Sequence, residues 1–426
     1  MKIRILVYFI VLLSFSQTQA QEEYARYIVK ELTAKSYHGR GYVFDGDRKA
    51  AQFLRNEFKK YKIQPLGDDY YQYYNLSANT FPTAPKVTIN GKKYTLAVDY
   101  LIDAACPAID GKFAIEVLEL TSPDPQVIAS IINNRNLEHK LLYIDEDLAL
   151  THMKAPQLRE VIDQLKNAGF HKGLILNSKQ KLKWRSLTYQ NKKASINTQS
   201  LFLDAKVKNV AQLKISPQLN PEYQTQNVCG FIKGTGGSDS TIVITAHYDH
   251  IGAIGKKVYF PGANDNASGT SMLMYLAKYY AEHVPKYNVV FLAFSGEEIG
   301  LLGSKHYAKN PLLELGKIKF LLNLDMAGTG DEGVQVVNGT IFKKEFDTLV
   351  RLNKEHNLMP QVKVRGPMDR SDHFPFYEKS IPCFFFYTLG GIDAYHDIYD
   401  RYETLPFTKF NNYAKLLIYY IDQYNK

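Results

Sequence analysis

The sequence predicts an α/β protein with a mixed, largely parallel central sheet, helices on both faces and a β-rich inserted domain. Short, near-continuous apolar runs alternate with helical segments in the second half of the chain, a pattern typical of sheets that are buried on both faces. A stretch of different texture, residues 86–215, separates this block from an amino-terminal helical part. We therefore expect one catalytic domain, formed by residues 21–85 and 216–426, that is interrupted by an insert.

The first 20 residues have the pattern of an export signal. Lys2 and Arg4 precede an apolar run from Ile5 to Phe15, and the small residue Ala20 ends the segment. This order is typical of a secretory signal peptide. The run is shorter than the roughly 20 residues that cross a bilayer. We expect an exported protein, periplasmic or extracellular, without stable membrane insertion.

The amino-terminal part, residues 24–61, contains two predicted helices around the turn-rich segment His38–Gly41. In the second helix, apolar residues recur at a spacing of three and four, as at Ala50, Leu54 and Phe58. The insert begins with a predicted hairpin, in which Val87–Ile89 and Tyr94–Ala97 flank an Asn-Gly turn.

The later part of the insert predicts an amphipathic helix from Gln157, a stop at Gly169 and an apolar strand at Leu174–Leu176. In the carboxy-terminal block, helices are expected after Ser268 and after Glu298. The predicted strands of this block are Thr241–Ala246, Val289–Phe294, Phe320–Leu324 and Pro382–Tyr387.

Charge and cysteine content exclude several classes of protein. The formal charge is +9, but the basic residues are spread thinly, which indicates solubility and not nucleic-acid binding. Three cysteines are too few for a disulfide scaffold. Cys229 and Cys383 lie in apolar runs, so we expect them to be buried.

Candidate metal ligands follow the predicted strands. His247 ends the first strand in the segment His-Tyr-Asp-His, where Asp249 could accept the other ring proton of a ligating histidine. An ordinary hydrogen-bonded histidine at a strand end explains this segment as well. Asp265, among small residues at the start of a helix, could bridge two cations or could simply cap that helix.

Glu297 and Glu298 are adjacent carboxylates at the end of an apolar strand. Because adjacent side chains point apart, one could bind metal while the other takes a proton from water; the alternative is a solvated acidic turn. Asp325 and His396 are two further candidates. Five nitrogen and oxygen ligands after successive buried strands predict a zinc centre, and a carboxylate-rich set suits a pair of ions.

These segments together resemble the co-catalytic di-zinc aminopeptidases related to bacterial leucyl aminopeptidase and to glutamate carboxypeptidase. The matching segments, in chain order, are Thr-Ala-His-Tyr-Asp-His, Gly-Ala-Asn-Asp-Asn-Ala-Ser-Gly, Phe-Ser-Gly-Glu-Glu-Ile-Gly, Asn-Leu-Asp-Met-Ala-Gly, Ser-Asp-His-Phe-Pro-Phe and Tyr-His-Asp-Ile-Tyr-Asp. The resemblance implies a zinc exopeptidase fold and hydrolysis of the amino-terminal bond of a peptide or protein.

The same resemblance implies roles for individual residues. One zinc would bind His247 and Asp325, the second would bind Glu298 and His396, and Asp265 would bridge them. Glu297 would be the general base toward a metal-bridged water. Asp249 would orient His247, and Tyr395 would hydrogen-bond the oxyanion.

Residues 86–215 resemble the protease-associated domain of larger relatives, most closely at Asn167–Asn177. We expect this insert to shape substrate access without a direct part in catalysis. His250 and His283 are expected to be surface or packing residues. His373 is left without a role, because a loop histidine hydrogen-bonded to Asp372 explains it as well.

Three other functions are compatible with parts of the pattern. Glutaminyl cyclases share the fold but resemble single-zinc transferases, whereas the segment around Asp265 looks more like the two-metal peptidases. A carboxypeptidase acting on acidic peptides would need basic residues near the substrate carboxylate, for which Arg365 and Arg370 are candidates. A receptor-like descendant without metals is disfavoured, because all five ligands and Glu297 are present.

Overall fold

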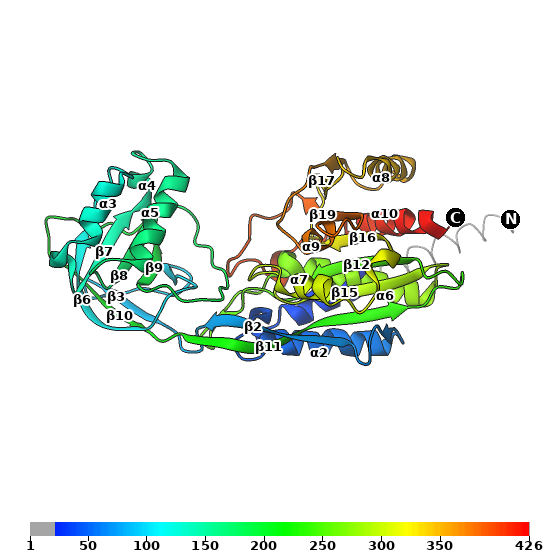
Figure 1. The fold of residues 1–426 in the computed structure, drawn as a ribbon, viewed down its shortest axis with the longest axis horizontal. Helices are drawn as coiled ribbons and strands as arrows, with labels where there is room; N and C mark the ends of the chain where they lie inside the picture. Colours follow the sequence, from blue (N-terminus) through cyan, green and yellow to red (C-terminus); the bar gives the residue numbers. More distant parts are fainter. Residues whose placement is uncertain (1–21, 426) are drawn as a thin grey trace, which may run out of the picture.

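The computed structural model describes residues 22–425, so the predicted signal peptide at residues 1–20 lies outside the described part. Figure 1 shows two lobes, a larger one that contains both ends of the described chain and a smaller one built from the cyan and green segments in the middle of the sequence. The long strands β2 and β11 run along the base of the larger lobe toward the smaller one.

The larger lobe is built on a nine-stranded sheet, the central sheet. Its four inner strands are parallel neighbours, and antiparallel pairings flank them on both sides. This arrangement confirms the predicted mixed α/β fold. In spatial order the strands are β1 (Gln64–Pro65), β11 (Gln218–Ile232), β15 (Asn288–Phe294), β12 (Thr241–His247), β16 (Ile318–Leu324), β19 (Cys383–Leu389), β17 (Gly333–Val337) and β18 (Val362–Val364), with β2 (Tyr71–Thr80) paired to β11.

Both faces of the central sheet are covered, as the apolar runs predict. Successive residues of a strand point to opposite faces. Accordingly, Ile242 and Ile244 belong to one hydrophobic core, while Val243 between them belongs to another. The helices of this lobe are residues 22–32, α2 (Gly46–Lys60), α6 (Gly269–Glu282), α7 (Leu302–Lys309), α8 (Lys343–His356), α9 (Phe374–Tyr377) and α10 (Phe410–Asp422).

The smaller lobe contains an eight-stranded sheet, the insert sheet, in which β6, β7, β8 and β9 are parallel neighbours. Three helices pack with it, so the insert is itself α/β and not only β-rich. The strands are β4 (Lys92–Lys93), β3 (Lys86–Ile89), β10 (Asn209–Ile215), β6 (Ile109–Val117), β7 (Lys140–Asp145), β8 (Gly173–Ser178), β9 (Ala194–Gln199) and β5 (Tyr100–Ile102), and the helices are α3 (Pro125–Ile132), α4 (Glu146–Ala149) and α5 (Ala155–Asn167).

The predicted hairpin at the start of the insert is correct in its turn and wrong in its second strand. Asn90 and Gly91 both have positive φ, at 48° and 80°, as a two-residue turn of this type requires. Such a turn pairs Ile89 directly with Lys92. The second strand is therefore Lys92–Lys93, and not Tyr94–Ala97.

The hydrophobic core of the insert continues into the larger lobe. One apolar cluster joins insert residues such as Tyr100 and Trp184 to Ile251, Ile254 and Phe260, which follow β12 in the chain. One contact between the lobes is the stacking of Trp184 on Phe260, with 5.1 Å between the ring centroids. The insert is thus packed onto the edge of the central sheet where the predicted ligands lie.

Cys106, Cys229 and Cys383 are free and buried, which confirms the expected packing role of the last two. Over residues 22–425, no helix has the length and apolar character needed to cross a membrane.

Candidate metal centre

Parallel strands bring the predicted ligands to one edge of the central sheet. His247 is the last residue of β12, Asp325 directly follows β16, and Glu298 lies shortly after β15. These strands are neighbours and run in the same direction, so their carboxyl ends meet. Asp265 and His396 reach the same place from the segment before α6 and the loop after β19.

Asp265 contacts a histidine with each of its carboxylate oxygens. Its Oδ1 lies 3.5 Å from Nε2 of His247, and its Oδ2 lies 3.1 Å from Nε2 of His396. Asp325 also approaches His247, with 3.4 Å between Oδ1 and Nε2. Glu298 also approaches His396, with 3.1 Å between Oε2 and Nε2. The five side chains therefore form two groups that share Asp265.

The residues fit a pair of metal ions. Three sets of donor atoms lie within 4.8 Å of one another. Two of them share Asp265, namely His247 with Asp265 and Asp325, and His250 with Asp265, Glu298 and His396, and the third is His247 with Glu297 and Glu298. Imidazole and carboxylate ligands together are a donor set that suits zinc. A buried group of several carboxylates also needs positive charge nearby, because desolvation penalises each ionised form.

Glu297 and Glu298 are adjacent but have opposite electrostatic surroundings. Burial raises the pKa of Glu297 well above its ordinary value, and the neighbouring carboxylate of Glu298 adds to this effect. For Glu298 burial also acts to raise the pKa, but His396 and His250 outweigh it and hold the pKa well below its ordinary value. Glu297 is thus the carboxylate of the pair suited to carry a proton.

Asp249 contacts both the ligand histidine and the Glu297 segment. The ring Nδ1 of His247 lies 3.2 Å from the backbone carbonyl oxygen of Asp249 and 3.6 Å from its carboxylate. The carboxylate itself accepts a hydrogen bond from the hydroxyl of Tyr42 at 2.9 Å and from the backbone N–H of Glu297 at 3.3 Å. Asp249 therefore contacts two predicted site residues, partly through its backbone.

His250 is the functional residue that the sequence interpretation missed most clearly. It is fully buried, and its Nδ1 lies 2.5 Å from Oε1 of Glu298. The structure excludes a surface position for His250, which is buried and contacts the oxygen of Glu298 that does not face His396. Its position in the same His-Tyr-Asp-His segment as His247 was an available signal. His283 is exposed, as expected.

Asp400 and Arg40 hold the segment that presents Asp265. The carboxylate of Asp400 accepts the backbone N–H groups of Asn264 and Asp265 at 2.8 and 3.0 Å. The buried guanidinium of Arg40, from the turn-rich segment near the amino terminus, donates to the carbonyls of Tyr248 and Gly262 at 2.7 and 2.8 Å. No role is predicted for these two residues from the sequence, since their partners lie more than a hundred residues away.

Gly262 allows this segment to pack closely. Its φ is +58°, and a Cβ there would lie 2.3 Å from the carbonyl oxygen of Asp265 and 2.4 Å from the ring of His250. A side chain at this position would displace both residues. The small residues around Asp265 thus permit its approach, as the sequence pattern indicates.

The insert reaches the metal centre through the backbone of Trp184. The ring Nδ1 of His396 lies 3.1 Å from the carbonyl oxygen of Trp184, and the N–H of Trp184 donates to the carbonyl of His396 at 2.9 Å. A ring nitrogen that donates to a carbonyl leaves the other nitrogen free to bind metal. The insert is predicted to shape substrate access without a direct part in catalysis, and this contact joins it to a predicted ligand.

Other predicted residues lie around the same site. The ring of Tyr395 stacks on that of His396, with 4.0 Å between ring centroids. Ser371 donates to Oδ2 of Asp325 at 2.9 Å. His373 is buried, and its ring nitrogens have no hydrogen-bond partner among the described residues, so the expected bond to Asp372 is not formed.

Two cavities of different size adjoin the centre. One, of about 160 Å³, is lined by Asp265, Glu297 and Asp325 together with Arg365 and Arg370. The other, of about 580 Å³, lies between the lobes and includes Glu298, His396 and residues of the insert in its lining. Tyr395 lines both cavities, so the predicted metal ligands lie between a small and a large space.

Comparison with known proteins agrees with this geometry. Residues 227–421 match the family model of Peptidase family M28. Aminopeptidase YwaD of Bacillus subtilis is 39% identical over 179 residues, which cover 40% of this chain and 37% of that protein. Probable leucine aminopeptidase 2 of Trichophyton verrucosum is 38% identical over 170 residues, covering 37% of this chain and 32% of that protein. The matches thus span well under half the length of these curated relatives.

Solved structures resemble the whole chain. A zinc aminopeptidase from Bacillus subtilis has a TM-score of 0.70 at 20% identity, with 95% of each chain covered. An aminopeptidase from an Aneurinibacillus strain has a TM-score of 0.66 at 21% identity, covering 94% of this chain and 93% of that one. At this level of identity the likeness shows the fold, including both lobes.

Proposed function

Because residues 227–421 match the family model of Peptidase family M28, we propose that this chain is an exported zinc-dependent aminopeptidase. The observation that carries the proposal is the position of Asp265, whose two oxygens face the Nε2 atoms of His247 and His396 separately. A carboxylate between two imidazoles, each with its own second carboxylate, is the arrangement that two zinc ions sharing one bridging ligand require.

The ligands divide into two sets around Asp265. One ion would be held by His247 and Asp325, and the other by Glu298 and His396. When bound, the zinc ions supply Lewis acidity, which polarises the scissile carbonyl and lowers the pKa of water. The names of the similar Bacillus subtilis structure and of several fungal relatives, which include zinc, support this choice of metal.

Glu297 is the proposed proton carrier. It accepts a proton from the attacking water and returns it to the nitrogen of the leaving amine, so that one peptide bond is exchanged for a carboxylate and an amine. Its raised pKa suits it to hold the proton between these two steps. Asp249 keeps it in place by accepting the Glu297 N–H, and Tyr395 is the proposed hydrogen-bond donor to the oxyanion.

The small cavity supports cleavage after a single first residue. Its volume is about 160 Å³, and Met326, Met368 and Phe385 contribute apolar and aromatic surface to it. A space of this size and character suits one bulky apolar side chain. We therefore expect amino-terminal leucine, methionine or phenylalanine to be favoured over charged residues.

A carboxypeptidase that acts on acidic peptides is the second candidate. The observation in its favour is that Arg365 and Arg370 line the small cavity together with Glu297. However, Arg365 already donates to the hydroxyl of Tyr387 at 2.6 Å. A glutaminyl cyclase with one zinc is less well supported, because the carboxylates around Asp265 form two donor groups.

The test is hydrolysis of a panel of aminoacyl chromogenic amides by the mature protein, before and after chelation, with a Glu297→Gln variant. We expect kcat/KM to fall by about 10²–10⁴-fold in this variant, because general base catalysis is worth that much, while the zinc content stays near two per chain. Glu282→Gln, at an exposed position, is the matched control.

Other outcomes of the same experiment identify the alternatives. Cleavage only of amino-blocked peptides with an acidic last residue would establish the carboxypeptidase, and cyclisation of amino-terminal glutamine would establish the cyclase. A folded protein that binds no zinc would overturn the proposal. Export is tested separately, because amino-terminal sequencing of secreted protein is expected to start near Gln21.

A further inference from the structure

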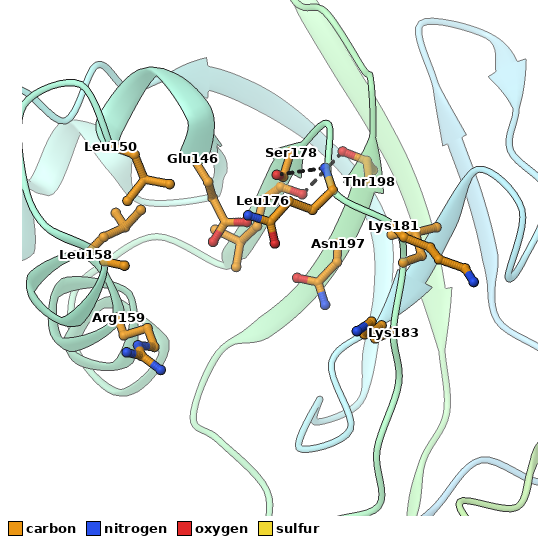
Figure 2. A pocket seen from close by; sticks show the side chains of 13 residues that line it. Glu146, Leu150, Leu158, Arg159, Leu176, Ser178, Lys181, Lys183, Asn197 and Thr198 are labelled. Carbon is orange, nitrogen blue, oxygen red and sulfur yellow. Dashed lines mark hydrogen bonds between the residues drawn. The ribbon is translucent and has the colours of Figure 1, made fainter. Parts of the chain in front are cut away.

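The large cavity beside the metal centre continues into a second cavity on the insert. This second space, shown in Figure 2, has a volume of about 490 Å³ and is lined only by insert residues. The two cavities share five lining residues, which identifies them as parts of one groove that starts at Glu298, Tyr395 and His396. The shared residues, which define the insert groove, are Glu146, Arg159, Leu176, Lys183 and Asn197.

The insert groove lies where an α/β sheet ordinarily binds ligands. Leu176 is near the carboxyl end of β8, and Asn197 is near the carboxyl end of β9. Glu146 begins α4 directly after β7. These strands are parallel neighbours, and the crevice at the carboxyl ends of such strands is the usual ligand position. The insert thus presents its own ligand position to the metal centre of the other lobe.

The lining combines apolar surface with unpaired positive charge. Leu150, Leu158 and Leu176 form an apolar side. In the view of Figure 2, Arg159 projects from α5 on one side and Lys183 lies on the other, with Asn197 between them. Among the described residues, neither Arg159 nor Lys183 forms an ion pair, and the Nζ of Lys183 lies 5.3 Å from the ring centroid of Tyr395.

Other charged side chains also line the large cavity, of which Asp163 and Glu298 are acidic and Arg185 is basic. Lys166 is paired with Asp103 at 2.6 Å, and Lys181 is paired with Asp397. The acidic side chain shared by both cavities is Glu146, and burial raises its pKa.

We propose that the insert groove binds the part of a peptide substrate that follows the scissile bond, and that Arg159 and Lys183 select a carboxylate there. The carboxylate is either an acidic side chain or the free terminus of a short peptide. The two sides of the metal centre differ in volume as this requires, since about 160 Å³ holds one side chain while the groove holds several residues. The direction in which the substrate peptide lies in the groove rests on the proposed aminopeptidase activity, whereas binding in the groove does not.

The first test compares peptides with an aminoacyl amide in wild type and in Arg159→Glu. The peptides are Leu-Ala-Glu-Ala amide, Leu-Ala-Ala-Ala with a free carboxylate, and Leu-Ala-Ala-Ala amide. We expect the wild type to favour both carboxylate-bearing peptides over the neutral one. In the variant, the ratio of kcat/KM for these peptides to kcat/KM for the aminoacyl amide should fall about tenfold, because a charge-assisted contact is lost and a repulsive charge is introduced.

The same peptides also serve to test a control variant and to distinguish the two sources of carboxylate. Lys208→Glu makes the same change of charge at an exposed insert position that lines neither cavity, and it should leave the ratio unchanged. Loss of preference for the Glu peptide alone identifies a side-chain site, and loss for the free-acid peptide alone identifies a terminus site. An unchanged ratio for both in Arg159→Glu overturns the proposal.

A second measurement does not depend on turnover. The dissociation constants of the three peptides for the Glu297→Gln protein, with and without Arg159→Glu, are measured by calorimetry in the presence of zinc. We expect about tenfold weaker binding of the carboxylate-bearing peptides when Arg159 is reversed. Equal affinities with and without Arg159→Glu would overturn the proposed binding in the groove, even if the wild type hydrolyses the aminoacyl amide. Groove binding in a protein that hydrolyses no amide would overturn only the aminopeptidase assignment.

Discussion

Both sheets of this protein contain a run of parallel strands, and polar residues lie near the carboxyl ends of these strands in different surroundings. In the central sheet, His247 and Asp325 are almost fully buried among other charged groups. In the insert, Arg159 of α5 and Lys183 of the segment between β8 and β9 are exposed. Buried charges with fixed partners suit metal binding and proton transfer, whereas exposed charges suit adaptable binding of a substrate.

Histidines show the same contrast. Burial lowers the pKa of His396, but Glu298 and Asp265 outweigh this effect and raise the pKa to about 11. In the insert, burial lowers the pKa of His171 to about 4, and no carboxylate opposes it. The difference lies in the neighbours and not in the residue type, so a buried histidine near a cavity indicates a metal site only together with its carboxylates.

The largest effect that tests this contrast is expected at the bridging ligand. Asp265→Ala removes the one carboxylate that both histidines share, so we expect loss of both zinc ions and no measurable amide hydrolysis. Zinc per chain is measured by mass spectrometry of the metal alongside activity. Asp347→Ala, on the exposed surface of α8, should retain both. A variant at Asp265 that keeps two zinc ions would contradict the bridging role.

A smaller effect is expected where the two lobes meet. Trp184 is 5% exposed, stacks on Phe260, and its indole N–H donates to the carbonyl of Ile102 at 3.0 Å. In Trp184→Ala the backbone that holds His396 should lose its position. Loss of such a contact to a ligand typically costs about 10–100-fold in metal affinity, and chelator competition measures it.

Loss of stability alone must be separated from this effect. Leu174→Ala creates a cavity in the core of the insert without touching His396, and it should lower the melting temperature with little change in zinc affinity. Trp184→Phe, which retains a ring on Phe260, should lie between wild type and alanine. If Leu174→Ala weakens zinc binding as much as Trp184→Ala, the carbonyl of Trp184 has no specific role.

The smallest expected effect is the pH dependence of the insert. His171 titrates near 6.5 when unfolded and near 4 when folded, so the unfolded chain binds more protons between these values. The contribution of His171 to the free energy of unfolding should therefore be fully present above pH 6.5. It should fall as the pH drops through this window, by up to about 3 kcal/mol. Thermal unfolding of wild type and His171→Leu is measured at pH 7 and 4.5. An equal loss of stability between the two pH values in both proteins would refute this prediction.

The fold and the site could be predicted from the sequence where a contact follows from residue type and strand order. The apolar runs identified β12, β15 and β16, and the residues after them reached one sheet edge because parallel strands must end together. Asn90-Gly91 predicted a turn correctly, but the register of the following strand depends on the geometry of that turn. The roles of the five ligands and of Glu297 remain predictions, although the structure brings these side chains together.

Contacts made through the backbone or between distant segments could not be predicted in this way. Trp184 acts through its carbonyl, a group that every residue carries, so its side chain gives no signal. Asp400 and Arg40 bind backbone groups of segments far away in the chain. His250 is different, because it lies in the same motif as His247, and a buried-ligand hypothesis could have been considered for it.

The pairing of β2 with β11 has a consequence for how this architecture can vary. The chain leaves the larger lobe after β2 and returns on β11, and Thr80 pairs with Gln218 across the gap. Topologically, the whole insert is the loop of a hairpin, which a two-residue turn could close. A version of this fold without the insert is therefore possible on two conditions. Polar side chains must replace Ile251, Ile254 and Phe260, and another acceptor must replace the carbonyl of Trp184.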